Sequence, residues 1–389
     1  MPSSAARLNT LPPYVFAIIA ERIRHMRADG LDVIRLDIGS PDMPPPNTVV
    51  EVLAESAHQA GHHGYTGYRG TDGFRQAISR YYAQRFDVDL DPYTEVLPLI
   101  GSKEGIVNFS LAFLDSGDTA LVPGIAYPSY AMGCHLAGGT VHWLHLHQEN
   151  GYLPDLASIP DVVAARAKII WVNYPNNPTG AVAETGFYEE LVDFCRVHDI
   201  LMASDNPYVD VTYDGYVAGS ALQTPGAKTC TVEFMSLSKT YNMAGWRLGA
   251  AVGNAEALKT LLRIKSNVDS GHFHAVYDAG VEALESTPQK WINKRNNIYR
   301  ARRDRVLAAL RQIGLEAGKP KGAMYIWAKV LDGDSRSYQE EALSAAHVSI
   351  APGETYGPDG EGYVRLSLST ADDRLDEALE RLIAWYASR

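Results

Sequence analysis

The sequence predicts an α/β protein in which helices sandwich a mostly parallel sheet, together with a smaller α+β domain. Three observations lead to this fold class. At 389 residues the chain exceeds the size at which a single hydrophobic core usually stops growing. Its first two thirds alternate helical patterns with short apolar or β-branched runs, which is typical of a parallel sheet. Its last third places two long helical stretches before three short apolar runs.

The individual elements follow from hydrophobic spacing and from turn residues. A helical spacing at 14–27 leads to the segment 41–46, where four prolines in six residues interrupt regular structure and indicate a domain border. Between that border and the last third, helices are expected at 49–60, 73–86, 103–114 and 184–198. Strands are expected at 95–100, 119–122, 168–172, 200–203 and 231–235.

The last third predicts the smaller domain. It contains helical stretches at 255–284 and 288–313, apolar runs at 324–330, 348–350 and 363–368, and a terminal helix from Asp372. We therefore expect three segments along the chain. These are an N-terminal arm with part of the small domain (1–46), a large domain (47–285) and a C-terminal small domain (286–389).

Composition excludes several classes of protein. The hydrophobic content of 46% and the charged content of 21% are those of an ordinary globular protein. The net charge of −11 argues against binding to nucleic acid or to an anionic membrane, because both normally require basic clusters. The most basic stretch, 294–305, follows a helical pattern and is interpreted as a solvated helix face. Its arginines are Arg295, Arg300, Arg302, Arg303 and Arg305.

Cysteines and apolar runs indicate the compartment. Cys134, Cys195 and Cys230 are odd in number and show no Cys-x-x-Cys spacing, so neither a disulfide framework nor a metal site is expected. Residues 1–10 lack the apolar core of a secretory leader, and no apolar run approaches the ~20 residues that span a bilayer. We expect a cytoplasmic protein without a membrane-spanning segment.

Chemically informative residues follow the expected strands, where ligands bind in an open parallel sheet. Gly101-Ser102-Lys103 follows the first strand and opens a helix whose free N–H groups suit a phosphate. An asparagine-rich and proline-rich loop, 173–180, follows the strand at 168–172, and Asp205-x-x-Tyr208 follows the strand at 200–203. A helix cap and ordinary turns explain each of these segments when it is taken alone.

A lysine, an arginine and several hydroxyls cluster after the strand at 231–235. Ser236-x-Ser238-Lys239 is followed eight residues later by Arg247. A primary amine can condense with a carbonyl, while a guanidinium and hydroxyls can hold a phosphate dianion. Pyridoxal 5′-phosphate (PLP) carries both groups, although a lysine in a polar loop is more often a solvated side chain.

Together these segments resemble the fold-type-I PLP enzymes, and specifically the class I/II aminotransferases similar to aspartate aminotransferase. The motifs are Asn-x-Pro-Asn-Asn-Pro-Thr-Gly at 173–180, Asp205-x-x-Tyr208, Ser-x-Ser-Lys239 with Arg247, and Arg365 in Tyr-Val-Arg-Leu-Ser. The resemblance covers nearly the whole chain. It implies a seven-stranded, mostly parallel sheet in a large PLP-binding domain, beside the smaller α+β domain.

The resemblance also implies roles for residues around the cofactor ring. Lys239 would form the Schiff base with PLP and later carry the proton of the substrate α-carbon. Asp205 would keep the pyridine nitrogen protonated, and Tyr208 would bond the phenolic oxygen together with Asn177. Tyr127 would stack on the face of the ring.

The phosphate and the substrate are assigned in the same way. The phosphate would be held by the backbone of Ser102 and Lys103, by Ser236 and Ser238, by Arg247, and by Tyr65 of a neighbouring subunit, which implies a homodimer with shared active sites. Arg365 would bind the α-carboxylate through two parallel N–H bonds. The remaining substrate contacts would come from Asn177, from Gly39 in a loop that closes over the carboxylate, and from Tyr14.

The reaction implied is a ping-pong transfer of an amino group from an amino acid to a 2-oxo acid. Segments 11–16, 36–42 and 101–106 resemble the LL-diaminopimelate aminotransferase branch, in which 2-oxoglutarate is the usual acceptor. The chain departs from that branch at 62–69, where His62 and His63 are interpreted as surface residues.

Several alternatives remain open. The donor could be aspartate, alanine or an aromatic amino acid, and a C–S lyase could use the same cofactor shell. A PLP-binding regulator would need a DNA-binding domain, for which the segment before the large domain is too short. A Rossmann-type nucleotide binder would need Gly-x-Gly-x-x-Gly after its first strand, and that motif is absent.

Overall fold

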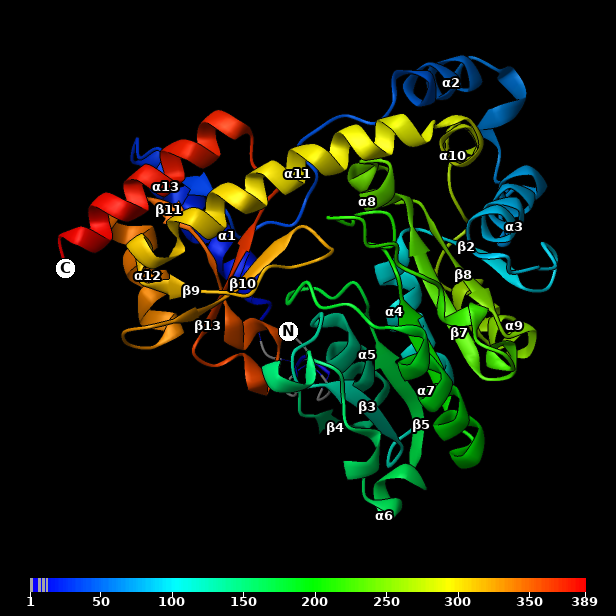
Figure 1. Ribbon diagram of the computed structural model, residues 1–389. Coiled ribbons are helices and arrows are strands. Elements are labelled where there is room, and N and C mark those ends of the chain that lie inside the picture. Colours follow the sequence, from blue (N-terminus) through cyan, green and yellow to red (C-terminus); the bar gives the residue numbers. More distant parts are fainter. Residues whose placement is uncertain (1–2, 6–7, 9–10, 12) are drawn as a thin grey trace.

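The computed structural model describes residues 3–5, 8, 11 and 13–389. Residues 1–2, 6–7 and 9–10, together with Pro12 of the segment 11–16, lie outside the described residues. Two lobes are visible in Figure 1, one around a seven-stranded sheet and one around a four-stranded sheet. The long helix α11 (Gln289–Ala309) runs across both lobes.

The larger sheet confirms the predicted seven-stranded, mostly parallel arrangement. Neighbouring strands are parallel except β8, which is antiparallel to both β2 and β7. Its spatial order is β2 (Val96–Leu99), β8 (Gly249–Gly253), β7 (Thr231–Ser236), β6 (Leu201–Asp205), β5 (Ala167–Val172), β3 (Thr119–Pro123) and β4 (Thr140–Leu144). β4 and β8 were not predicted, because β4 is a half-exposed edge strand and β8 contains only small residues and one valine.

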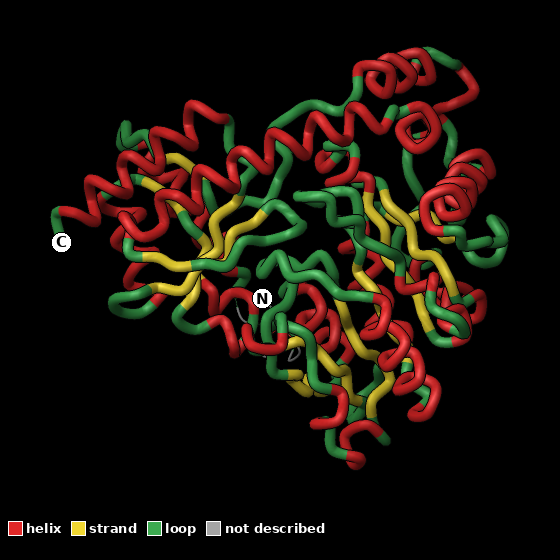
Figure 2. Tube along the Cα trace, in the orientation of Figure 1, coloured by secondary structure: helices red, strands yellow, loops and turns green. Residues whose placement is uncertain are grey.

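Helices cover both faces of this sheet, as the red coils on either side of the yellow strands show in Figure 2. On one face Phe109 of α4 packs against Trp171 and Phe234. On the other face Ile170 and Met202 pack against α7. The helices of this lobe are α2 (Asn47–Ala57), α3 (Asp72–Phe86), α4 (Ser102–Phe113), α5 (Ser129–Ala137), α6 (Asp161–Ala164), α7 (Thr185–His198), α8 (Leu237–Thr240), α9 (Ala255–Lys265) and α10 (His274–Ser286).

The helical stretch predicted at 255–284 is wrong in one respect, since the structure divides it into α9 and α10. The intervening segment 266–273 contains Gly271 at φ 81°, a conformation that favours glycine. A Cβ on Gly271 would also lie 2.7 Å from the carbonyl oxygen of Gly67. The break between α9 and α10 therefore allows the segment 266–273 to lie close to the loop that contains Gly67.

The smaller lobe confirms the predicted α+β region. Its sheet is antiparallel in the order β12 (Ala351–Pro352), β13 (Tyr363–Ser367), β10 (Tyr325–Val330) and β9 (Leu315–Glu316). The remaining helices are α12 (Ser335–Ala345), α13 (Asp372–Ala387) and α1 (Val15–Ala28). The parallel pairing of β1 (Ile34–Arg35) with β11 (Val348–Ser349) places the N-terminal segment beside the C-terminal third.

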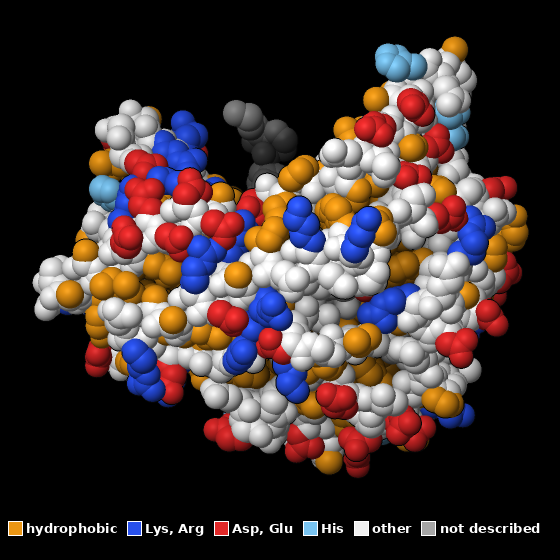
Figure 3. All heavy atoms as spheres, turned by 45° about the horizontal axis from the view of Figure 1, so that its top comes forward, with side chains coloured by type: hydrophobic (Ala, Val, Ile, Leu, Met, Phe, Trp, Pro, Cys, Tyr) orange, Lys and Arg blue, Asp and Glu red, His pale blue; other side chains and the backbone are white. Residues whose placement is uncertain are grey.

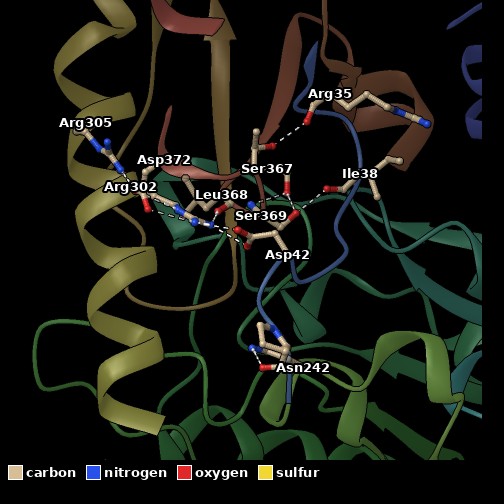
Figure 4. A network of polar contacts seen from close by, with 12 residues as sticks. Arg35, Ile38, Asp42, Asn242, Arg302, Arg305, Ser367, Leu368, Ser369 and Asp372 are labelled. Atoms are coloured by element: carbon tan, nitrogen blue, oxygen red, sulfur yellow. Dashed lines mark hydrogen bonds and ion pairs between the residues drawn. The ribbon is translucent and has the colours of Figure 1, made fainter. Parts of the chain in front are cut away.

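The arginines of α11 correct an interpretation made from the sequence. Arg295, Arg302 and Arg303 are buried, so this face of the helix is not solvated. Arg302 binds both carboxylate oxygens of Asp42 at 2.8 and 2.9 Å, and it donates to the carbonyl oxygen of Leu368 at 3.0 Å (Figure 4). A helical charge pattern does not distinguish solvated arginines from arginines that satisfy buried carbonyl groups.

The surface carries charges of both signs. Acidic and basic side chains are intermixed on the face drawn in Figure 3. Among the described residues, no helix has the length and apolar character needed to cross a membrane. The three cysteines are buried and unpaired.

The contacts of Arg302 lead to a test of stability. Arg302→Ala should lower the free energy of unfolding by about 3 kcal/mol, because it leaves Asp42 and a buried carbonyl without their partner. Arg305→Ala is the matched control, since the Arg305 side chain is 35% exposed and pairs with half-exposed aspartates. That loss should stay below about 1 kcal/mol. Urea denaturation followed by circular dichroism measures both values, and equal losses would contradict this account.

Candidate active site

A cavity of about 390 Å³ lies between the two lobes, where β5, β6 and β7 end. The structure brings thirteen of the fourteen predicted site residues together there, and Tyr65 is the exception. Those lining the cavity are Tyr14, Gly39, Ser102, Lys103, Tyr127, Asn177, Asp205, Tyr208, Ser236, Ser238, Lys239, Arg247 and Arg365. The rule that ligands bind beyond the carboxyl ends of parallel strands explains this convergence.

Lys239 lies on α8, a single helical turn after β7. The Ser236 hydroxyl caps this turn by accepting the Ser238 N–H at 3.2 Å. The Lys239 amine donates to the carbonyl oxygen of Gly39. Burial, together with the positive charges of Arg365 and Arg247, lowers the pKa of Lys239 to about 7. Near neutral pH a substantial fraction of this amine is therefore uncharged and able to attack a carbonyl or accept a proton.

Asp205 ends β6 and offers one free carboxylate oxygen. Its Oδ2 accepts from the Tyr130 hydroxyl at 2.6 Å, while its buried Oδ1 has no hydrogen-bond partner among the described residues. Burial raises the pKa of Asp205 to about 7, against the lowering effect of the bond from Tyr130. A cationic N–H donor in the cavity would satisfy Oδ1 and stabilise the ionised form.

Two residues that support Asp205 received no role from the sequence. Tyr130 stacks on Trp171 with ring centroids 4.7 Å apart, which fixes the hydroxyl that bonds Asp205. The sequence offered one sign of this role, because Tyr130 lies on α5 only three residues after the predicted site residue Tyr127. The Asn173 side chain donates to the Asp205 carbonyl oxygen at 2.6 Å and accepts the Asn177 N–H at 2.8 Å. Asn173 therefore joins the end of β6 to the loop that carries Asn177.

Tyr208 is held by a residue that the sequence analysis missed. Its hydroxyl lies 2.8 Å from the hydroxyl of Tyr325, the first residue of β10. Tyr325 also explains Gly39, because a Cβ on Gly39 would overlap the Tyr325 hydroxyl. Tyr325 lies 117 residues from Tyr208 along the chain, and a lone tyrosine at a strand start carries no distinctive signal.

Arg365 projects from β13 of the smaller lobe and is 3% exposed. Its Nη1 donates to Asn177 Oδ1 at 2.9 Å, and its Nη2 donates to the carbonyl oxygen of Asp37. The Nε atom has no partner among the described residues. The guanidinium carbon lies 4.1 Å from the ring centroid of Tyr325, which orients the group. A planar, oriented guanidinium with an unused donor suits a carboxylate.

Arg247 is another arginine that lines the cavity. The Arg247 guanidinium packs so closely on Gly101 that a Cβ there would overlap it, and Gly101 has φ 74°. Directly after Gly101, α4 begins with the backbone N–H groups of Ser102 and Lys103. These N–H groups have no partner within the helix, so this part of the cavity suits a phosphate. The Lys103 amine instead lies over the Tyr14 ring, 4.6 Å from its centroid.

Tyr65 lies outside this cavity and is 92% exposed. It follows the short helix η2 (Ala60–His63) in a loop that extends from the larger lobe. Its predicted contact with a phosphate in a neighbouring subunit stays a prediction.

Comparison with known proteins shows the family to which this chain is similar. Residues 31–382 match the model of the family described as aminotransferase class I and II. An LL-diaminopimelate aminotransferase from Moorella thermoacetica is 48% identical over 379 residues, which cover 97% of each chain. The structure of substrate-bound BacF from Bacillus subtilis shares 34% identity with a TM-score of 0.94, covering 99% of this chain and 98% of that one. A probable N-succinyldiaminopimelate aminotransferase from Thermus thermophilus shares 38% identity with a TM-score of 0.90, covering 95% and 100%.

The chain therefore belongs to the class I and II aminotransferases. It is an aminotransferase of the fold-type-I architecture, and its substrates are amino acids and 2-oxo acids. Members of this family generally depend on PLP. The resemblance inferred from the motifs is confirmed.

The pKa of Lys239 predicts how stability depends on pH in the cofactor-free protein. The folded pKa of about 7 lies below the ordinary value of 10.5, so the unfolded chain binds more protons between these two values. The free energy of unfolding of the native sequence, relative to Lys239→Met, should rise by on the order of 3 kcal/mol between pH 7 and pH 10. Urea denaturation at several pH values measures this difference. A difference that does not change with pH would show that Lys239 is not desolvated.

Proposed function

We propose that this aminotransferase binds PLP in the cavity and moves an amino group from LL-diaminopimelate to 2-oxoglutarate. One observation carries the proposal. The same cavity holds a lysine amine whose pKa is about 7 and a buried carboxylate with an unpartnered oxygen. A carbonyl and a protonated ring nitrogen on one ligand would use both groups.

The residues present fit this cofactor. Asp205 Oδ1 would accept the N–H of the ring nitrogen, and the Tyr208 hydroxyl and the Asn177 amide would bond the phenolic oxygen. Tyr127 would stack on the ring, since its side chain lines the cavity. The phosphate would be bound by Ser102, Lys103, Ser236, Ser238 and Arg247. When bound, PLP supplies an electron-withdrawing ring that stabilises negative charge at the substrate α-carbon.

The side chains of the protein would position the substrate and move its proton. Arg365 would bind the α-carboxylate, which fixes the α-carbon relative to Lys239. The uncharged Lys239 amine would then accept the proton of the α-carbon, because its pKa near 7 suits a base at neutral pH. Gly39 and Tyr325 line the cavity in contact with each other, and with a substrate bound they would limit the access of water.

The relatives support the choice of donor. The Moorella enzyme carries the name LL-diaminopimelate aminotransferase, and so does one from Aquifex aeolicus that is 46% identical over 97% of both chains. We propose 2-oxoglutarate as the acceptor because the segments 11–16, 36–42 and 101–106 resemble that branch. Tyr14 would contribute to the side-chain pocket.

The exposed Tyr65 supports a homodimer. Tyr65 is 92% exposed in the loop after η2, so its side chain is accessible to another chain. We propose that Tyr65 reaches the phosphate in the partner subunit, so that the two active sites are shared. We also propose that residues 1–46 form an N-terminal arm and part of the small domain, that 47–285 form the large domain and that 286–389 form the C-terminal small domain. We further propose that the protein works in the cytoplasm.

A donor screen tests the function. The purified protein with PLP should lose the absorbance of the Lys239-bound cofactor when LL-diaminopimelate is added, and 2-oxoglutarate should restore it. Glutamate, aspartate, alanine and phenylalanine serve as competing donors. Lys239→Ala should abolish turnover and the starting absorbance, because the Lys103 amine, which also lines the cavity, lies over the Tyr14 ring and does not take its place. Transamination by that variant, or release of ammonia and pyruvate by the native enzyme, would overturn the proposal.

Substitution of Arg365 separates substrate binding from cofactor binding. Arg365→Ala should raise the KM for the donor by the equivalent of about 2–5 kcal/mol, since a charge-assisted pair of hydrogen bonds is lost. The Kd of PLP should change far less, because Arg365 makes none of the proposed contacts to the cofactor. Steady-state kinetics and a cofactor titration measure the two effects. Equal losses in both would contradict the assigned role of Arg365.

A further inference from the structure

A cluster of metal-ligating side chains lies outside the active-site cavity. His62 belongs to η2, while His274 and Asp278 lie one turn apart on α10. The Nδ1 atoms of His62 and His274 lie 3.5 and 3.2 Å from Asp278 Oδ2. The two imidazole rings stack with centroids 3.8 Å apart. His62 is therefore a half-buried, bonded residue, and its interpretation as a surface residue is wrong.

The two separations from Asp278 are compatible with a metal site, although in the metal-free protein they are also those of polar contacts to its carboxylate. In a tetrahedral zinc site with bonds of about 2.0–2.1 Å, neighbouring ligand atoms are separated by about 3.4 Å. The measured separations of 3.2 and 3.5 Å lie on either side of this value. All three candidate ligand atoms lie within 4.8 Å of one another. We propose that His62, His274 and Asp278 bind a divalent transition metal, with zinc as the best match.

The chemistry of the ligands favours zinc over harder cations. Two imidazole nitrogens and one carboxylate oxygen form a ligand set that zinc accepts, whereas magnesium and calcium prefer oxygen ligands alone. Two neutral imidazoles and one carboxylate carry a charge of −1, so a divalent ion is only partly neutralised. A water molecule can complete the tetrahedron.

The Ser56 hydroxyl contacts two of the three candidate ligand atoms, and an ion that bound His62 Nδ1 would displace the N–H which faces this hydroxyl. The hydroxyl donates to Asp278 Oδ2 at 2.5 Å, and it lies 2.8 Å from His62 Nδ1. Residues that hydrogen-bond to metal ligands orient those ligands and raise metal affinity. Ser56 on α2 therefore links a third segment to the site.

Metal binding would hold together the loop that follows His62 and the loop that precedes His274. Neither loop lines the active-site cavity of its own chain. His62 shortly precedes the loop that carries Tyr65, and His274 follows the segment 266–273. The two loops already touch, because the Thr66 hydroxyl donates to the His272 carbonyl oxygen at 2.8 Å. A bound ion would restrict both loops at their bases. This site does not depend on the proposed function.

Zinc binding by the untagged holoenzyme tests the proposal. After equilibrium dialysis against zinc and removal of free PLP, the native protein should retain one zinc ion per chain, measured by elemental analysis. His62→Gln, His274→Gln and Asp278→Asn should each weaken binding by more than about 100-fold, since even the partners of zinc ligands contribute about 10- to 100-fold. Zinc should also raise the Tm of the native protein and leave that of the three variants unchanged.

His63→Gln is the matched control. His63 is the adjacent histidine, is exposed, and stacks on Phe273 with ring centroids 5.6 Å apart instead of facing Asp278. This variant should bind zinc as the native protein does. Circular dichroism and cofactor absorbance identify any variant that fails to fold. The zinc affinities of the ligand variants that do fold then decide whether the site exists. No zinc retained by the native protein, or equal retention by folded ligand variants, would overturn the proposal.

Discussion

The desolvation of one amine and one carboxyl group at the edge of the large sheet is the constraint on which the site depends. β6 ends at Asp205, and β7 leads directly into Ser236 and the turn that carries Lys239. Because these strands are parallel neighbours, their carboxyl ends meet, and both groups are removed from water by the surrounding core. Burial brings the pKa of each group to about 7 from opposite directions. Each therefore changes its charge readily near neutral pH, which an exposed aspartate or lysine does not.

The smaller lobe supplies what the sheet edge lacks, a fixed positive charge for a carboxylate. Arg365 reaches across from β13, and the chain holds it with Asn177 of one lobe and the Asp37 backbone of the other. Its charge also helps to lower the pKa of Lys239. The group that would bind the substrate thus adds to the effect of burial in favouring the uncharged form of the base.

The sequence predicted the parts of this site that are encoded locally. Asp205, Asn177, Lys239 and Arg247 each stand in a short motif after an apolar strand, so their convergence followed from the topology of a parallel sheet. The supporting residues were not predictable in this way. Tyr325 meets Tyr208 from another lobe, and Tyr130 acts through a hydroxyl whose partner is 75 residues away. Such contacts arise from tertiary packing, and a tyrosine in a helix or strand usually indicates only a core position. β8 was missed for a related reason, since glycines and alanines give a strand no β-branched signal.

The buried arginines of α11 show why the position of Lys239 depends on residues far from the cavity. Arg295 donates to the carbonyl oxygen of Lys239 itself at 2.9 Å, and Arg302 donates to Leu368, three residues beyond Arg365. One helix therefore binds the backbone of Lys239 and the backbone close to Arg365. A guanidinium can satisfy several carbonyl groups at once, and a buried carbonyl without a donor is costly. The helix α11 therefore helps to hold the backbone of Lys239 and the segment that follows Arg365, although its sequence resembles that of an ordinary solvated helix.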